Sequence, residues 1–266
     1  MREFALNFWL GCAVLLGQPG PREIVQRSLA AADCGWKAQD TYKYTQRDEE
    51  LHLDSRGQVK SEDVDVTRIT FVNGAPLEET IAHNGGPPTP AEVRKGQELR
   101  RKLQTETPAQ RAARVEKEQE NRAFIREVPD AFTFRLLGAD RINGRPAWVL
   151  EATPRPGYQS HTRYGKIFSK VRGKLWVDQQ DYGWMKVDAT VTEAFSMGFF
   201  LARIQRGSHI VFEQERVADG IWLPRRIEVR ANARILFFVN YNTREVVTYS
   251  DYRAARPLDL AYSAPK

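Results

Sequence analysis

The sequence predicts an α+β protein made mainly of antiparallel strands, about ten of them, with two helical regions. Three observations support this class. From residue 184 to 192, apolar residues alternate with polar ones, which is the period of a half-buried strand. Similar runs continue to residue 252, separated by turn residues with almost no helical pattern. Neither a βαβ alternation nor an internal repeat is present. We therefore expect a broad, curved sheet with one apolar face.

The first half of the chain is expected to begin with a helix. Residues of Pro21–Lys37 are apolar at spacings of three and four, and Gly35 is expected to end this helix. Residues 90–126 are rich in charges of both signs and poor in large apolar side chains. They predict a solvent-exposed helical insertion at the rim of the sheet. Strands are expected between these regions at Tyr42–Leu53, Val64–Val72 and Pro76–Asn84.

The second half of the chain predicts strands only, joined by turns. Asn143-Gly144 and Asp219-Gly220 are hairpin signals, and Asn240, Tyr241 and Asn242 are expected to form another turn. The expected strands are Ala131–Leu137, Pro146–Thr153, Lys166–Val171, 173–178, 184–192, His209–Arg216, Ile221–Ala233, Ile235–Asn242 and Glu245–Tyr252.

The N-terminus resembles an export signal. A short charged start precedes apolar residues from Phe4 to Gly17, too few to span a bilayer comfortably. We expect a signal peptide over 1–19, one β-rich domain over 20–266, and a location in the periplasm or cell envelope; a buried N-terminal helix is the alternative. Leu10-Gly11-Cys12 is similar to a lipoprotein box, but Trp9 replaces its leucine, so a lipid anchor at Cys12 is not favoured.

Composition narrows the function. Hydrophobic residues make up 41% of the 266 residues, which suits a globular core. The net charge is +6, but 40 basic residues face 34 acidic ones, so the surface is mixed. No basic run is interleaved with aromatic residues, and nucleic acid is not an expected partner. Without the signal, Cys34 is the only cysteine, so no internal disulfide can form.

Catalytic and metal-binding patterns are missing from the sequence. The four histidines have no cysteine or carboxylate at ligand spacing, and the Gly-x-Ser-x-Gly elbow is absent. Ser208 and His209 are adjacent, but neighbours on a strand point to opposite faces. Asp178 and Asp181 flank a turn and are expected to stabilise it. The sequence thus predicts a protein that is not an enzyme and needs no metal or cofactor.

One apolar connection is unusual, because connections are normally polar. It joins two strands over residues 194–204. We interpret it as a lid or lipid-contacting loop; the alternative is a short buried helix, or strand extensions that close the end of a barrel. The predicted hydrophobic ligand site consists of Phe195, Met197, Phe199, Phe200 and Leu201, with the strand residues Trp176, Val187, Val191 and Val229.

Three short motifs carry a family resemblance. They are Gly-Lys-Leu-Trp-Val-Asp at 173–178, Asp-Gly-Ile-Trp-Leu-Pro at 219–224 and Tyr-Ser-Asp-Tyr at 249–252. With the amphipathic first helix, they resemble the outer-membrane lipoprotein-sorting (LolA-like) superfamily and a branch of bacterial envelope proteins grouped near it, over most of 22–255. The resemblance implies a half-open β-barrel covered by helices, whose cavity binds acyl chains. The chain differs by its insertion at 90–126, and the carriers' gating arginine matches no position.

Two functional hypotheses follow. The first is a periplasmic carrier or binding protein for a lipid, lipoprotein acyl chain or other hydrophobic ligand, and contact with a membrane surface is an expectation of this hypothesis. The second is a non-enzymatic envelope sensor or interaction module that acts through the charged helices.

Overall fold

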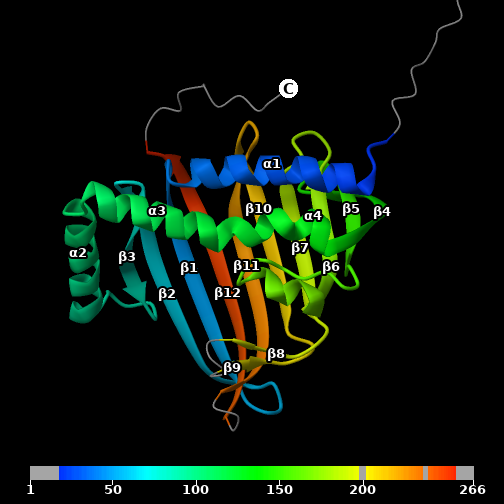
Figure 1. Ribbon diagram of the computed structural model, residues 1–266. Helices are drawn as coiled ribbons and strands as arrows, with labels where there is room; N and C mark the ends of the chain where they lie inside the picture. Colours follow the sequence, from blue (N-terminus) through cyan, green and yellow to red (C-terminus); the bar gives the residue numbers. More distant parts are fainter. Residues whose placement is uncertain (1–17, 198–201, 236–238, 256–266) are drawn as a thin grey trace, which may run out of the picture.

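A computed structural model describes residues 18–197, 202–235 and 239–255. Its main feature is one antiparallel sheet with the strand order β3-β2-β1-β12-β11-β10-β7-β6-β5-β4 (Figure 1). The edge strands β3 and β4 do not pair with each other, so the sheet stays open. The strands are β1 (Tyr42–Leu53), β2 (Val59–Val72), β3 (Ala75–His83), β4 (Phe132–Ile142), β5 (Arg145–Pro154), β6 (Val171–Asp178), β7 (Trp184–Val191), β8 (Phe195–Met197), β9 (Ala202–Ile204), β10 (His209–Ala218), β11 (Ile221–Ile235) and β12 (Val239–Ala254).

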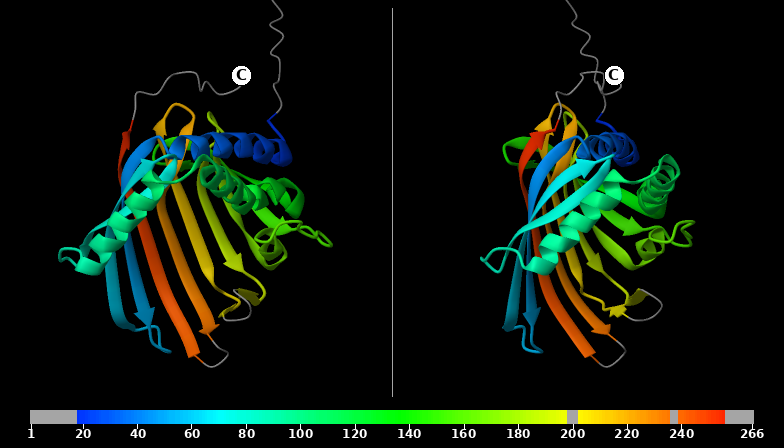
Figure 2. Two further views of the ribbon diagram at one scale, coloured as in Figure 1. Left: turned by 60° about the vertical axis from the view of Figure 1, so that its left-hand side comes forward. Right: turned by 90° about the vertical axis from the view of Figure 1, so that its left-hand side faces the viewer.

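One face of this sheet, which we call the inner face, is covered by α1, with α3 and α4 on the same side, whereas α2 packs outside the edge strand β3 (Figure 2). The longest helix, α1, crosses the end of the sheet, and α3 runs below it across the open side (Figure 1). The predicted α+β class, with about ten antiparallel strands in an unclosed sheet covered by an N-terminal helix, is therefore confirmed. The helices are α1 (Pro21–Gln39), α2 (Pro90–Gln104), α3 (Pro108–Arg122), α4 (Val128–Ala131), and the 3₁₀ helices η1 (Ala123–Glu127) and η2 (Gly165–Lys170).

The apolar stripe of α1 forms the main core with β5 and β6. Ile24 and Val25 are fully buried against a cluster that contains Leu150 and Val177. A buried hydroxyl connects the helix to β7, because Trp184 donates its indole N–H to Ser28 Oγ over 2.8 Å. Ser28 in turn donates to the Val25 carbonyl. The predicted amphipathic helix thus packs as its periodicity indicates.

Gly35 does not end α1, as the sequence suggested; the helix continues to Gln39. Its role is close approach. A Cβ at this position would lie 2.5 Å from the carbonyl oxygen of Trp222 in β11. That distance is far below van der Waals contact, so the helix can only lie this near the sheet because position 35 lacks a side chain.

We expect Gly35→Ala to lower the free energy of unfolding by about 1–3 kcal/mol, because the helix must shift away from β11. Gly96→Ala is the matched control in α2, where the added Cβ would lie 3.7 Å from the nearest atom. There the substitution is expected to stabilise the protein by about 0.5–1 kcal/mol through helix propensity. Urea unfolding measures both. Equal effects of the two changes would contradict the close-approach argument.

The charged insertion forms two capped helices. Thr89 with Glu92 and Thr107 with Gln110 each form a capping box. Of these two helices, α2 packs on the edge strand β3, where its Leu103 is buried against Leu77. In contrast, α3 has no buried residue.

Two strand predictions are wrong. Residues Lys166–Val171 were expected to form a strand, but 165–170 are the 3₁₀ helix η2, whose shape buries Phe168. Residues 235–252 were expected to form two strands with a turn at 240–242. In the structure Ile235 ends β11, and 239–254 form one strand, β12, in which Asn242 pairs with Asn232 of β11. The long pairing with β11 outweighs the local turn preference of the asparagines.

Candidate functional site

A cavity of about 410 Å³ lies between the inner face and the segments that cover it. Its volume falls within the range of small-molecule sites. The lining is almost entirely apolar. Strand residues that line it are Phe132, Phe134, Ala152, Val171, Arg172, Gly173, Lys174, Leu175, Trp184, Val187, Ala189, Ile210, Phe212 and Gln214; the remainder are Ala32, Trp36, Phe124, Ile125, Val128, Ile167 and Phe168.

The cavity exists because small residues meet on three neighbouring strands. Ala152 of β5 pairs with Gly173 of β6, and Gly173 pairs with Ala189 of β7. Directly paired residues share a face, so these three positions make a shallow row on the inner face. At Gly173 a Cβ would lie 2.2 Å from the carbonyl oxygen of Asp188, which excludes any side chain. The larger side chains of Ile210 and Phe212 lie on the next strand, β10.

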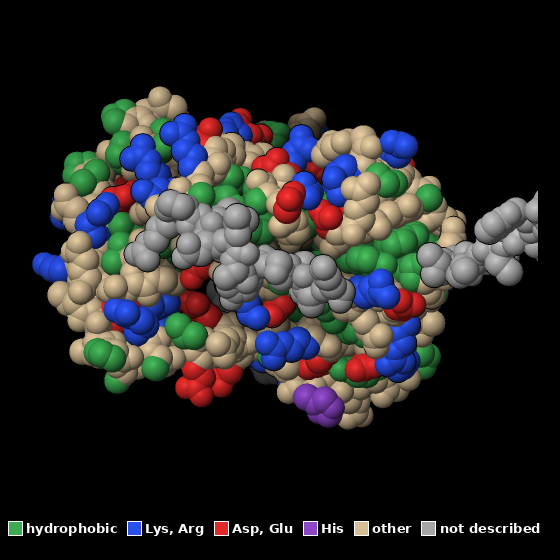
Figure 3. Space-filling view, turned by 90° about the horizontal axis from the view of Figure 1, so that it is seen from above, with side chains coloured by type: hydrophobic (Ala, Val, Ile, Leu, Met, Phe, Trp, Pro, Cys, Tyr) green, Lys and Arg blue, Asp and Glu red, His purple; other side chains and the backbone are tan. Residues whose placement is uncertain are grey.

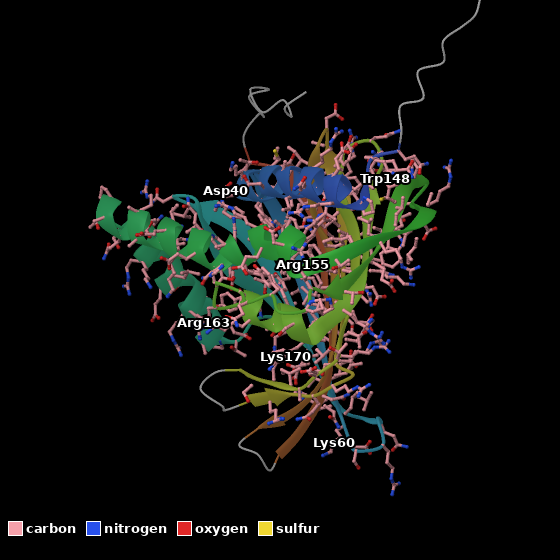
Figure 4. The ribbon with its side chains drawn as sticks, turned by 45° about the vertical axis from the view of Figure 1, so that its right-hand side comes forward. Asp40, Lys60, Trp148, Arg155, Arg163 and Lys170 are labelled. Carbon is pink, nitrogen blue, oxygen red and sulfur yellow. The ribbon has the colours of Figure 1, made fainter. Side chains whose placement is uncertain are left out.

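Aromatic side chains form the cover of the cavity. Phe168 of η2 contacts Phe124 of η1 and Phe132 of β4, with ring centroids 6.0 and 5.2 Å apart. The segments are also joined by a hydrogen bond of 2.8 Å, which Tyr158 Oη donates to Glu127 Oε2. The basic side chains of Arg155, Arg163 and Lys170 lie on the segment between β5 and β6, between α1 and the end of the sheet that carries Lys60 (Figure 4).

The structure brings only some of the predicted site residues to this cavity. Val187 lines it. Val229 is paired with Ile210, which lines it, and Val191 lies farther along the same face of β7. Trp176 lies elsewhere. It neighbours Leu175 and faces the opposite side of β6, where its indole N–H donates to Asp140 Oδ2 over 3.0 Å.

The apolar connection at 194–204 contains two short strands, and β9 extends the sheet by pairing with β11. Phe195 and the backbone of Met197 belong to β8. Phe199, Phe200 and Leu201 lie outside the described residues. Residues 1–17, which hold most of the expected signal and Cys12, also lie outside them.

An acidic region on the inner face was missed by the sequence analysis. Asp48 of β1 pairs with Asp65, and Glu245 of β12 pairs with Glu50. No described Lys, Arg or His forms an ion pair with Asp48 or Glu245, and Asp48 Oδ1 is buried without a hydrogen bond. Burial, together with the neighbouring carboxylates, raises the pKa of both groups. Sequence reasoning could not find this acidic region, because Asp48 and Glu245 lie far apart in the sequence and become neighbours only when β1 pairs with β12.

Asp48→Asn is therefore expected to raise the free energy of unfolding at pH 7 by about 0.2–1 kcal/mol, since it removes a like-charge pair. The folded-state pKa is raised, so the folded protein binds the proton more tightly and loses stability as pH rises through that pKa. The gain should thus vanish near pH 3. Thermal unfolding of the wild type and the variant at pH 7 and at pH 3 measures the difference in stability. The exposed Glu62→Gln is the control, and a gain that persists at pH 3 would contradict the explanation.

Three described histidines, His52, His83 and His209, have carboxylate neighbours, contrary to the sequence analysis, and His83 belongs to a group of three residues that could ligate a metal. Potential ligand atoms of Asp65, His83 and Glu92 all lie within 4.8 Å of one another. His83 Nδ1 is 2.7 Å from Asp65 Oδ1, and this hydrogen bond raises the pKa of His83. Glu92 is already used by the capping box of α2, where it accepts from the Thr89 N–H over 2.6 Å. Structural hydrogen bonds therefore account for this cluster.

Acidic and basic side chains are interspersed on the surface seen from above (Figure 3), as the balanced composition suggests. Among the described residues, no helix is both long and apolar enough to cross a membrane.

Comparison with known proteins gives structural similarities only: no protein-family model and no curated protein matches the chain. A LolA superfamily protein from Nitrosomonas europaea is similar at 13% identity, covering 85% of this chain and 92% of that one, with a TM-score of 0.34. A putative outer membrane lipoprotein-sorting protein domain from Vibrio parahaemolyticus is similar at 14% identity, covering 89% of this chain and 95% of that one, with a TM-score of 0.34. A chain of the MucA/MucB complex of Pseudomonas aeruginosa is similar at 12% identity, covering 87% of this chain and 99% of that one, with a TM-score of 0.23.

The descriptions of the first two structures name the LolA superfamily and lipoprotein sorting, and these names apply to those proteins. At such identities and TM-scores the similarities carry no information on ligand or activity, which have to be inferred from the cavity itself.

Proposed function

We propose that this chain is a carrier or binding protein of the cell envelope that holds a hydrophobic ligand, such as a lipid or the acyl chain of a lipoprotein, in the cavity of its open barrel. The observation that supports this is a cavity of about 410 Å³ with an almost wholly apolar lining. Each methylene moved from water into such a site contributes about 0.8 kcal/mol. Affinity would therefore come from apolar area.

A non-enzymatic role is part of the proposal. Among the described lining residues, only Arg172 and Lys174 have side chains that carry charge, and both are exposed. General acid–base catalysis needs titratable groups within hydrogen-bonding reach of a substrate. Arg172 and Lys174 flank the inner-facing Gly173 on β6 and therefore point to the outer face, so they do not supply an acid–base pair. Export is proposed from residues 1–19, and membrane-surface contact from the apolar connection at 194–204.

Titration of the delipidated protein with N-phenyl-1-naphthylamine tests the ligand-binding proposal, since this dye becomes fluorescent in apolar surroundings. We expect a saturable signal with one site per chain, and displacement by a long-chain alcohol. A signal that rises linearly without saturation, or none at all, would overturn the proposal.

A second candidate function is supported by α3, whose 15 residues are all at least partly exposed and include charges of both signs. In this second function the protein is a non-enzymatic interaction or sensor module, which binds a partner through the charged helices α2 and α3. Exchanging the exposed neighbours, Glu116→Lys with Lys117→Glu, keeps the net charge. If this change abolishes formaldehyde cross-links to envelope proteins while dye binding is unchanged, the interaction role is favoured; unchanged cross-links favour the carrier alone.

A further inference from the structure

One polar side chain in the cavity has no partner. Gln214 of β10 lines the cavity and is only 6% exposed. No other described residue forms a hydrogen bond with its side-chain amide. It lies on the same strand as Phe212 and Ile210, which also line the cavity. An otherwise apolar wall thus presents one amide.

The residue paired with Gln214 on the neighbouring strand offers the amide no hydrogen-bond donor. Gln214 is paired with Pro224 of β11, next to an irregularity between Glu213 and Gln214. Proline has no backbone N–H to offer. The Pro224 carbonyl accepts a hydrogen bond from Tyr252 Oη. The amide is not among the fully buried polar atoms that lack a partner, so it is accessible from the cavity that Gln214 lines. A ligand that covered it without a hydrogen bond would lose about 1–3 kcal/mol, so a ligand with a hydrogen-bonding group is favoured.

The chemistry of the lining limits what that partner is. An amide can donate to a carbonyl or hydroxyl oxygen and accept from a hydroxyl. It cannot compensate a buried carboxylate, whose desolvation costs several kcal/mol. Within the described part of the chain, the cationic residues of the lining are Arg172 and Lys174; both are exposed, flank the inner-facing Gly173 of β6, and are separated from β10 by β7. The group near Gln214 is therefore uncharged.

We propose that Gln214 hydrogen-bonds an uncharged carbonyl or hydroxyl group of the ligand. The ligand class is then a neutral amphiphile, such as an acyl ester, an acyl amide or a long-chain alcohol, rather than a plain hydrocarbon or a free fatty acid bound through its carboxylate. This inference rests on the proposed function and specifies its ligand.

Competition with bound N-phenyl-1-naphthylamine tests it, using 1-octanol, octane and, at pH 8, octanoate. Gln214→Met removes the amide and keeps the side-chain length. The wild type should prefer 1-octanol over octane by a factor about three- to tenfold larger than the variant does, as expected for one neutral hydrogen bond. Octanoate should compete worse than 1-octanol in the wild type. Gln97→Met, at an exposed position of α2, should change no ratio.

The outcomes separate this inference from the proposed function. Equal 1-octanol to octane ratios in wild type and Gln214→Met, with dye still bound, overturn the role of Gln214 alone. Failure of both proteins to bind dye overturns the proposed function instead.

A measurement on the wild type covers the case in which Gln214→Met does not fold. The infrared band of methyl octanoate labelled with ¹³C at its carbonyl should shift to lower wavenumber on binding, relative to its position in hexane. An unshifted band would overturn the proposal. If Gln214→Met folds and the carbonyl band shifts equally in that variant, the proposal is also overturned, because a water or another group would then donate the hydrogen bond.

Discussion

Asp178→Ala is expected to lower the free energy of unfolding by about 3–5 kcal/mol, because it removes the buried carboxylate that pairs with Arg145 and leaves that guanidinium only the longer contact to Asp181, at 3.4 Å, and the Gln180 amide. Asp178 is fully buried. Its carboxylate accepts two hydrogen bonds from Arg145, at 2.7 and 3.0 Å, and one from each backbone N–H of Gln180 and Asp181, at 2.8 Å. The same interactions hold the β6–β7 turn, which agrees with the turn-stabilising role expected from the sequence.

The pH dependence of this site has a definite sign. Burial would raise the pKa of Asp178, but the hydrogen bonds from Arg145 and the turn amides lower it overall. A lowered folded-state pKa gives stability that is present above the unfolded-state value and is lost as pH falls. Urea unfolding of wild type and Asp178→Ala should therefore differ most near pH 7 and less toward pH 2.

Asp219→Ala is the control, because Asp219 pairs with Arg216 but its side chain is 98% exposed. Such a surface ion pair contributes at most about 1 kcal/mol. A loss at Asp178 no larger than that at Asp219 would contradict the structural role assigned to the buried carboxylate.

Ala189→Phe is expected to weaken the binding of a hydrophobic ligand by about 200-fold. Ala189 lies in the row of small residues that makes room for the ligand. A benzyl group at this position would displace about four ligand methylenes, each contributing about 0.8 kcal/mol. Dye titration measures the affinity, and circular dichroism checks that the variant keeps its strands.

Thr190→Phe is the matched control on the same strand. Thr190 neighbours Ala189 and points to the outer face, where it pairs with Arg172 and His209. We expect it to leave the affinity unchanged. Equal affinity of Ala189→Phe and wild type would place the ligand outside the cavity.

Much of the fold could be predicted because local patterns and tertiary structure agree. The strand at Tyr42–Leu53 has the predicted bounds, and α1 begins at the predicted Pro21. The prediction failed where tertiary contacts override local preference. Pairing with β11 keeps Asn242 inside one long strand, and burial of Phe168 is achieved by a 3₁₀ turn instead of a strand.

The candidate site was less accessible to sequence reasoning. Its hollow depends on Ala152, Gly173 and Ala189 coming into register across three strands, and no single segment reveals that alignment. The pairing of Gln214 with Pro224 depends in the same way on the register between β10 and β11. Trp176 could have been excluded earlier, because Leu175 belongs to the inner face and neighbouring strand residues face apart.

Photo-cross-linking with an aliphatic diazirine alcohol tests the central claim most directly. The probe is bound to the delipidated protein, activated with light, and the labelled residues are found by peptide mass spectrometry. We predict labels on cavity-lining side chains such as Phe168, Ile210 and Phe212, which excess 1-octanol should suppress. Labels confined to the outer face, around Trp176 for example, or labels that 1-octanol does not reduce, would contradict the account.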